Sequence, residues 1–155
     1  DYFNDCVEEV GLDLEAKNIE LNYSNLVDPA TQVIADPEQM KRVINNIIGN
    51  SVKYIDKPHG IIDIRILDEV DSIRIEIEDN GKGIAAKDLS MIFDRFYRTD
   101  ASRNSAQGGS GIGLSIVKKI VEDHGGYIWA TSKETEGTCM HIVLRKYAEA
   151  EKETV

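Results

Sequence analysis

The stretch "QGGSGIGLSIVKKIVEDHGG", residues 107–126, places four glycines directly before a strongly periodic segment. From Leu114 onward, apolar residues recur at spacings of three and four with charged residues between them, which predicts an amphipathic helix over 111–124. A glycine inside a helix costs about 1 kcal/mol relative to alanine, so these glycines weaken the first turn. One interpretation is that the segment is a plain loop that ends in a helix, because a loop tolerates glycine. Alternatively, the unobstructed N–H groups of this helix start would bind an anion such as phosphate.

A second helix is predicted over 36–55, "DPEQMKRVINNIIGNSVKYI", with Asp36 as N-cap and Pro37 at the first helical position. Its apolar residues fill one broad sector of the helical wheel. A second, narrow stripe of polar residues runs along the same helix. It could be an ordinary solvated face, but such a face usually carries good helix formers, and asparagine is a poor one. Neutral amide oxygens one turn apart suit a Mg²⁺ that phosphates already neutralise, and a lysine one turn further along could contact a phosphate. The stripe consists of Arg42, Asn46, Asn50, Lys53 and Tyr54.

The remaining periodicity predicts a helix over 1–18, a short helix over 85–93 and several strands. Two strands, 60–70 and 72–80, alternate apolar and polar residues around a turn at Asp71–Ser72, which is typical of a hairpin. This order predicts an α+β domain: a two-layer α/β sandwich with helices on one face of a mixed, mainly antiparallel sheet. The other predicted strands are 19–23, 31–35, 127–134 and 137–146.

Two segments lack periodicity. Residues 94–110 form a long loop that contains Gly, Ser, Asn and charges, and loops of this length are often functional lids. The charged segment 148–155 is expected to be a disordered tail, which leaves 1–147 as one domain.

The net charge of -10 over 155 residues argues against a nucleic-acid surface. A bound polyphosphate would therefore need placed cations, backbone N–H groups and a metal ion. No apolar run approaches the roughly 18 residues of a membrane span, and no signal-peptide pattern is present. Cys6 and Cys139 lie outside any CxxC pairing, which argues against zinc and favours a reduced cytosolic compartment.

The segment "EDNGKGI", residues 78–84, follows a predicted strand. Asp79 at the strand end could accept a hydrogen bond from a ligand amine, and Gly81 and Gly83 would let the backbone approach a flat ring. A simple turn explains the same residues, because Asp-Asn-Gly is a common turn sequence.

The combination of these segments is more specific than any one of them. "NNIIGNSVKY" (45–54), "DNGKGI" (79–84), "IFDRFYR" (92–98), the glycine-rich helix start and "EGT" (136–138) occur in one order and spacing. They resemble the nucleotide-binding boxes of the ATP-binding catalytic domain of sensor histidine kinases. That domain belongs to the superfamily shared with DNA gyrase, Hsp90 and MutL, which has the Bergerat fold. The resemblance covers essentially the whole chain.

The resemblance implies a Mg-ATP site in which Asn50 is the Mg²⁺ ligand and Asn46 lies beside the phosphates. Lys53 would contact phosphate and Tyr54 would line the nucleoside pocket. At the base, Asp79 would accept from the adenine N6 amine. The residues that shape the base pocket around it are Gly81, Gly83, Ile84 and Thr138.

The resemblance also implies a lid over the phosphates. Phe93 and Phe96 would anchor this lid, and Arg98 would point toward the γ-phosphate. Asn46, Lys53 and Arg98 would then be the catalytic residues. The implied phosphate cradle consists of Gly109, Ser110, Gly111, Ile112, Gly113 and Leu114.

The sequence departs from the family pattern at Thr135, which replaces the first glycine of the closing Gly-x-Gly-Thr and puts the local turn in doubt. Asn46 also occupies the position at which the superfamily's ATPases carry a water-activating Glu. An amide cannot take a proton from water at neutral pH, so ATP should be bound and hydrolysed slowly. This suits a phosphodonor that transfers the γ-phosphoryl to a histidine elsewhere.

The family's phosphoacceptor histidine sits in a helical hairpin upstream, and none of His59, His124 and His141 has such a setting. We interpret all three as structural or surface residues, so the chain is expected to be the catalytic half of a protein-histidine kinase. The implied partners are ATP, the phosphoacceptor hairpin of the same parent and a response regulator. We expect a monomeric cytoplasmic fragment without membrane contact. Alternatives are an anti-sigma-type serine kinase and a non-catalytic nucleotide-binding module, whereas Asn46 disfavours a gyrase-like ATPase.

Overall fold

The computed structural model describes residues 2–94 and 113–147. The predicted lid, most of the phosphate cradle and the predicted tail therefore lie outside the described residues. The helices are α1 (Tyr2–Ala16), α2 (Pro37–Tyr54), α3 (Ala86–Leu89) and α5 (Gly113–Asp123). The strands are β1 (Ile19–Asn25), β2 (Gly60–Asp68), β3 (Ser72–Asp79), β4 (Tyr127–Lys133) and β5 (Gly137–Arg145).

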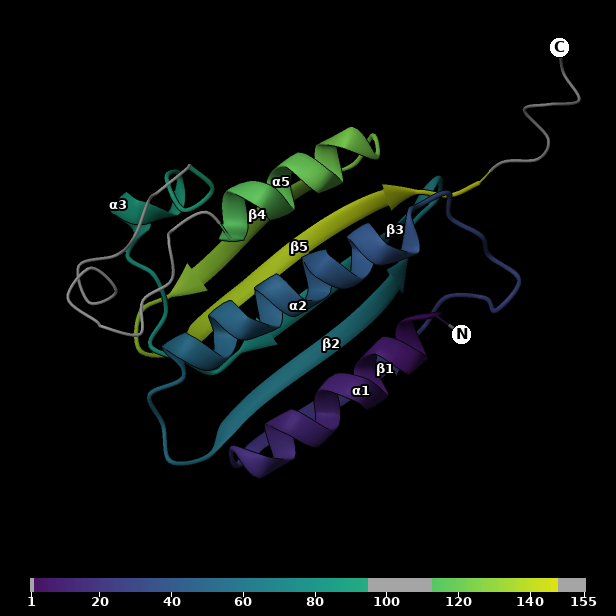
Figure 1. Ribbon diagram of the computed structural model, residues 1–155. Helices are drawn as coiled ribbons and strands as arrows, with labels where there is room; N and C mark the ends of the chain where they lie inside the picture. The colour runs from purple at the N-terminus through teal and green to yellow at the C-terminus, as the bar shows by residue number, and fades with distance from the viewer. Residues whose placement is uncertain (1, 95–112, 148–155) are drawn as a thin grey trace, which may run out of the picture.

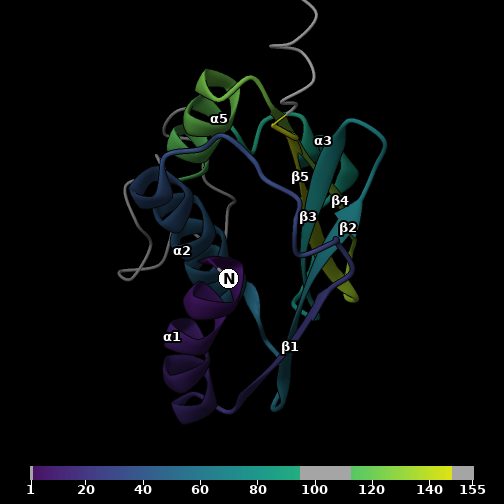
Figure 2. The same ribbon diagram turned by 90° about the vertical axis from the view of Figure 1, so that its right-hand side faces the viewer.

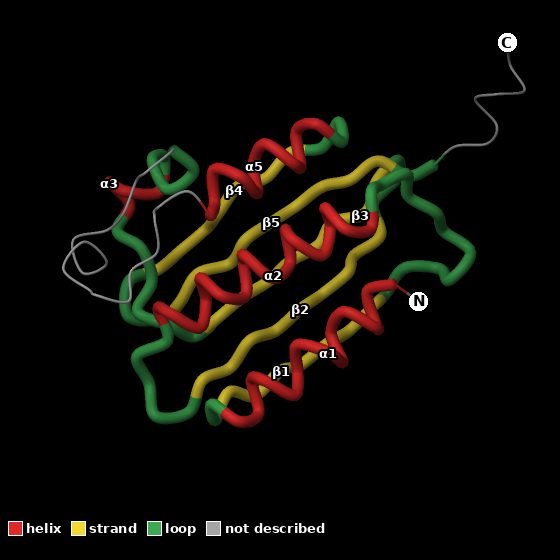
Figure 3. The backbone as a smooth tube through the Cα atoms, viewed as in Figure 1, coloured by secondary structure: helices red, strands yellow, loops and turns green. Residues whose placement is uncertain are grey.

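The five strands form one mixed sheet with the order β1-β2-β3-β5-β4 (Figure 3). Only β1 and β2 pair in parallel, because α2 carries the chain back between them. The other three pairs are antiparallel. The sheet is mixed and mainly antiparallel, as the sequence predicts.

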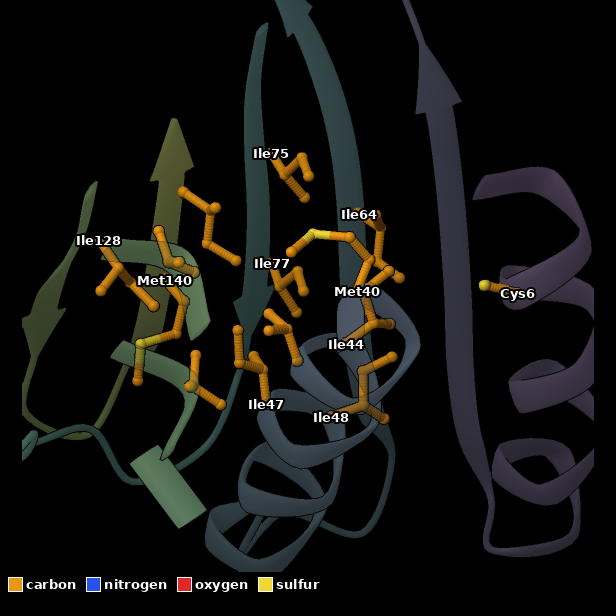
Figure 4. Close-up of a cluster of buried hydrophobic side chains, with 14 of the residues drawn as sticks. Cys6, Met40, Ile44, Ile47, Ile48, Ile64, Ile75, Ile77, Ile128 and Met140 are labelled. Atoms are coloured by element: carbon orange, nitrogen blue, oxygen red, sulfur yellow. The ribbon is translucent and has the colours of Figure 1, made fainter. Parts of the chain in front are cut away.

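The helices α1, α2 and α5 cover one face of this sheet, so the molecule has two layers (Figures 1 and 2). Alternate residues of a strand point to opposite faces, and burial in β2 and β3 alternates accordingly. The isoleucines of these strands meet the apolar sector of α2 and form the centre of the core (Figure 4). The core residues from α2 are Met40, Val43, Ile44, Ile47 and Ile48.

The start of α2 is fixed by its cap and by α5. The Asp36 carboxylate accepts hydrogen bonds from the backbone N–H groups of Glu38 at 3.0 Å and Gln39 at 3.4 Å, which confirms the predicted N-cap. The Asp36 N–H in turn donates to His124 Nε2 at 3.0 Å. His124 Nδ1 lies 2.7 Å from the Ile120 carbonyl, which can only accept. Nε2 therefore accepts while Nδ1 donates, and His124 links the end of α5 to the start of α2.

One predicted strand is absent, and several predicted boundaries differ from those of the structure. Residues 31–35 do not form a strand: only Val33 makes an isolated bridge, with Lys146. This segment carries the chain from the end of β1 in the sheet to the start of α2 in the helix layer (Figure 2), so it leaves the sheet after this single bridge. The helix predicted over 85–93 is reduced to α3, and the β2–β3 turn spans 69–71 because Ser72 already belongs to β3.

Within the described ranges, no helix has the length and apolar character that crossing a membrane requires.

Candidate nucleotide-binding site

The predicted contact residues that the structure describes gather at one end of the sheet. The C-terminal end of α2, the end of β3 and the starts of β5 and α5 all lie there (Figure 1, left). On α2, the side chains of Asn46 and Asn50 are half-buried, Lys53 is exposed and Tyr54 is half-buried. The helical repeat aligns Asn46, Asn50 and Lys53 on one stripe that the core does not cover.

Asp79 is the last residue of β3 and is only 7% exposed. One carboxylate oxygen, Oδ1, accepts from the backbone N–H of Gly81 at 2.9 Å and from that of Thr138 at 3.4 Å. Thr138 is the register partner of Asp79 on β5, so the pairing of these strands brings the two together. Burial raises the pKa of Asp79, and hydrogen bonds from Gly81, Ser51 and Thr138 oppose this rise without cancelling it.

Gly81 and Gly83 are required by the packing of their own loop. A Cβ on Gly81 would lie 2.6 Å from the Tyr54 carbonyl oxygen and 2.9 Å from Asp79 Oδ1. Gly83 has φ +77°, and a Cβ there would collide with the Lys133 carbonyl. These glycines let the loop after β3 pack against both α2 and the β4–β5 turn. The sequence left a simple turn and the approach of a ligand both open for these glycines, and the observed packing of the loop was not predicted.

The loop after β3 is joined to the β4–β5 hairpin through Ser132. Ile84, which is buried, donates its N–H to Ser132 Oγ at 2.7 Å. The same hydroxyl lies 2.9 Å from Thr138 Oγ1 and donates to the Gly137 carbonyl at 2.9 Å. Sequence reasoning missed both Ser132 and Ser51, because a single serine in a strand or helix carries no spacing signal.

The departure at Thr135 leaves the turn intact. Thr135 has φ +70°, in the left-handed region that favours glycine. Its N–H donates to the Lys82 carbonyl at 2.7 Å, and the Lys82 N–H donates to the Tyr54 carbonyl at 3.0 Å. The Lys82 ammonium also lies 4.9 Å from the centroid of the Tyr54 ring. The turn, the loop after β3 and the end of α2 thus form one connected wall.

The phosphate end of the predicted site is described only in part. Gly113 is exposed as the first residue of α5, and Leu114 packs half-buried against the core. Phe93 also packs against the core. The remaining predicted contacts lie outside the described residues: Phe96, Arg98, Gly109, Ser110, Gly111 and Ile112.

A cavity of about 660 Å³ lies at the opposite end of the sheet, lined mainly by the connection between β1 and α2 and by the first residues of α1 and α2. Its lining includes Phe3, Met40, Ile66 and Leu144, and none of the predicted nucleotide contacts. This cavity is therefore separate from the predicted nucleotide contacts.

On the sheet face away from the helices, ligand atoms of Glu76, Cys139 and His141 lie within 4.8 Å of one another. The Glu76 carboxylate is already held by Arg65 Nε at 3.0 Å and His141 Nδ1 at 3.0 Å. Burial, with the charges of Glu76 and Glu78, raises the pKa of the Cys139 thiol to about 12. A thiol that stays protonated is a poor metal ligand, so we interpret this group as a hydrogen-bonded polar cluster.

Comparison with known proteins identifies the family. Residues 35–148 match the family described as "Histidine kinase-, DNA gyrase B-, and HSP90-like ATPase". The chain therefore belongs to this family of ATP-binding domains, as the resemblance implied. The sensor histidine kinase WalK of Bacillus subtilis (strain 168) is 40% identical over 121 residues, which cover 77% of this chain and 20% of WalK. WalK of Staphylococcus aureus (strain Newman) is 41% identical over 111 residues, 70% of this chain and 18% of that protein. The chain thus spans about a fifth of each relative.

Solved structures agree with the fold class. The mycobacterial sensor histidine kinase MprB aligns with a TM-score of 0.78 at 26% identity, over 93% of this chain and 95% of that chain. A nucleotide-free form of the catalytic domain of histidine kinase ThkA aligns with a TM-score of 0.75 at 28% identity, over 93% and 94%. The α+β sandwich predicted from the sequence is confirmed.

Proposed function

We propose that this domain binds Mg-ATP and donates the γ-phosphoryl to a histidine on a separate helical hairpin of the same parent kinase, in two-component signalling. The surroundings of Asp79 carry the proposal. A buried carboxylate is costly unless its oxygens are hydrogen-bonded, and backbone N–H groups reach Oδ1. The second oxygen is the acceptor that we assign to the adenine N6 amine.

At the phosphate end, we assign the Mg²⁺ to the amide oxygen of Asn50. The half-buried, uncharged oxygen suits an ion whose charge the phosphates already balance, and Asn46 and Lys53 share its stripe on α2. When bound, the ion would neutralise charge that develops on the phosphates. Arg98 and residues 109–114 remain proposed phosphate contacts.

Asn46 supports transfer over hydrolysis. A neutral amide holds no proton-accepting lone pair basic enough to activate water. None of the three histidines in the described residues has surroundings that suit a phosphoryl acceptor. His124 is occupied at the α2–α5 junction, His141 at Glu76, and His59 makes an exposed contact with Glu20. A histidine supplied by another domain is therefore the proposed acceptor.

The parent protein is proposed from its relatives, which are sensor kinases. This favours a histidine over a serine as the acceptor, a response regulator as the downstream partner and a cytoplasmic position for the domain. We propose that the domain is monomeric.

The proposal is tested by calorimetric titration with Mg-ATP and Mg-GTP. We expect a clear preference for ATP, because guanine presents a carbonyl where adenine presents an amine. In Asp79→Asn the side-chain amide would face the adenine amine, so the preference should disappear while the fold persists. Loss of a hydrogen bond to a charged acceptor corresponds to about 1.5–3 kcal/mol, roughly a 10- to 100-fold loss of affinity. Equal affinity of the unmodified domain for both nucleotides would refute the assignment.

A further inference from the structure

Lys57 lies in the connection between α2 and β2, outside every stretch that carries the family resemblance. Its ammonium lies 2.5 Å from the Asn80 carbonyl oxygen, 3.1 Å from that of Gly81 and 3.0 Å from that of Thr135. An ammonium has three N–H donors, so these three carbonyls match its donor capacity. The arrangement resembles a small cation site whose ion is tethered to the chain.

The three carbonyls come from the two segments that surround Asp79. Asn80 and Gly81 begin the loop after β3, and the Gly81 N–H donates to Asp79 Oδ1. Thr135 belongs to the β4–β5 turn, three residues before Thr138, which donates to the same oxygen. The connection from α2 to β2 and this turn lie at the same end of the sheet (Figure 1). Lys57 therefore adds a further link between the two segments that position the buried carboxylate.

The carbonyls, and not the neighbouring acid, determine where this ammonium lies. Asp56 Oδ1 is 3.7 Å away, and the Asp56 side chain is 56% exposed, so solvent screens this pair. The carbonyl contacts are shorter and charge-assisted, and they come from segments far from Lys57 in sequence. Loss of the ammonium would leave three converging carbonyl dipoles without a common donor.

We propose that Lys57 is a positioning residue for the adenine end of the nucleotide site. By fixing the loop after β3 against the β4–β5 turn, it holds Asp79 in the geometry that distinguishes adenine from guanine. The inference rests on the proposed function, because it assigns a further residue to the same site. It adds a residue that touches no nucleotide and acts only through its backbone partners.

The experiment compares Lys57→Met with the unmodified domain. Methionine keeps an unbranched stem of similar length and removes the ammonium. Lys146→Met is the matched control: Lys146 also contacts a backbone carbonyl, that of Val70, and forms an ion pair with Asp68. Each variant loses one positive charge and the contact of one lysine ammonium with the backbone carbonyl of a turn or loop. Lys146 lies beyond the far end of β5, away from Thr138, so only Lys57→Met disturbs the site.

Calorimetry should show that Lys57→Met weakens Mg-ATP binding about tenfold, with little change for Mg-GTP, so the ATP-over-GTP ratio falls by a similar factor. Lys146→Met should change neither value by more than about twofold. A merely structural role would lower the folded fraction and reduce both affinities alike, so the ratio separates the two explanations.

Lys57→Arg provides a second variant if Lys57→Met does not fold. Arginine keeps the charge, but its planar fork cannot place three donors at one point. It should fold and show an intermediate ATP-over-GTP ratio. An unchanged ratio in a folded Lys57 variant would overturn the positioning role alone. If the unmodified domain shows no preference for ATP, both the proposed function and this inference fail.

Discussion

At the scale of single residues, the surroundings of Asp79 make its ionisation depend on the fold. Burial raises its pKa above the ordinary value of 3.8, despite the hydrogen bonds that favour the charged form. The folded state therefore holds the proton at pH values where the unfolded chain has lost it. Stability from this group is complete below pH 3.8 and is lost as the pH rises through the folded-state pKa.

Asp79→Asn should remove this pH dependence. At neutral pH the variant should be at least as stable as the unmodified domain, because it no longer buries a charge. The advantage should shrink as the pH falls toward 3.8, where Asp79 is protonated in both states. Urea unfolding at several pH values measures the difference. An advantage that grows toward acid pH would contradict the direction assigned to this pKa.

Thr135→Gly should stabilise the domain. A β-branched residue at φ +70° costs about 1–2 kcal/mol, and this exceeds the extra unfolded-state entropy of glycine, about 0.5–1 kcal/mol. The expected gain is therefore up to about 1 kcal/mol, measured by urea unfolding. Glu134→Gly is the control, because the neighbouring Glu134 has no positive φ and its replacement should destabilise. Equal losses in both variants would show that Thr135 is not strained.

Cys139 should be unreactive in the folded domain. Burial and the nearby carboxylates of Glu76 and Glu78 raise its pKa to about 12, so almost no thiolate exists at pH 8. Alkylation by iodoacetamide, followed by mass spectrometry, should modify Cys139 only after denaturation. Rapid modification at pH 8 without unfolding would contradict this description of the cluster.

At the scale of elements, His124 supplies a hydrogen-bonded link between the end of α5 and the start of α2. His124→Ala would leave the Asp36 N–H without its acceptor and remove the link to Ile120. We expect a loss of about 1–3 kcal/mol in the free energy of unfolding. His59→Ala should cost much less, because its contact with Glu20 is exposed. Similar small losses in both variants would contradict the structural role of His124.

Elements with strong local signals were predictable from the sequence. Helix α2 has an N-cap, a proline and a continuous apolar sector, and its predicted start agrees with the structure. The segment 31–35 has the composition of a strand but pairs only through an isolated bridge at Val33, since it crosses between layers. The pattern of residues indicates which secondary structure a segment can form. The position of the segment in the fold determines whether a neighbouring strand is available for pairing.

At the scale of the whole molecule, the order of strands and much of the site depend on distant partners. The pairing of β3 with β5 brings Thr138 to Asp79, and the family resemblance alone supplied that proximity in advance. Lys57, Ser51 and Ser132 could not be predicted. Each is a common residue type whose partners come from other segments, so no local spacing marks it.

The role that we propose for this domain is that of a phosphodonor whose acceptor histidine lies on another domain. The most direct measurement is incubation of the domain with Mg²⁺ and γ-labelled ATP, with and without the separately produced phosphoacceptor hairpin of the same parent. We predict acid-labile label on the hairpin only when both parts are present, with no label on the domain and slow release of phosphate, because Asn46 cannot activate water. Acid-labile label on the domain itself, rapid phosphate release, or an unlabelled hairpin despite bound ATP would contradict the account.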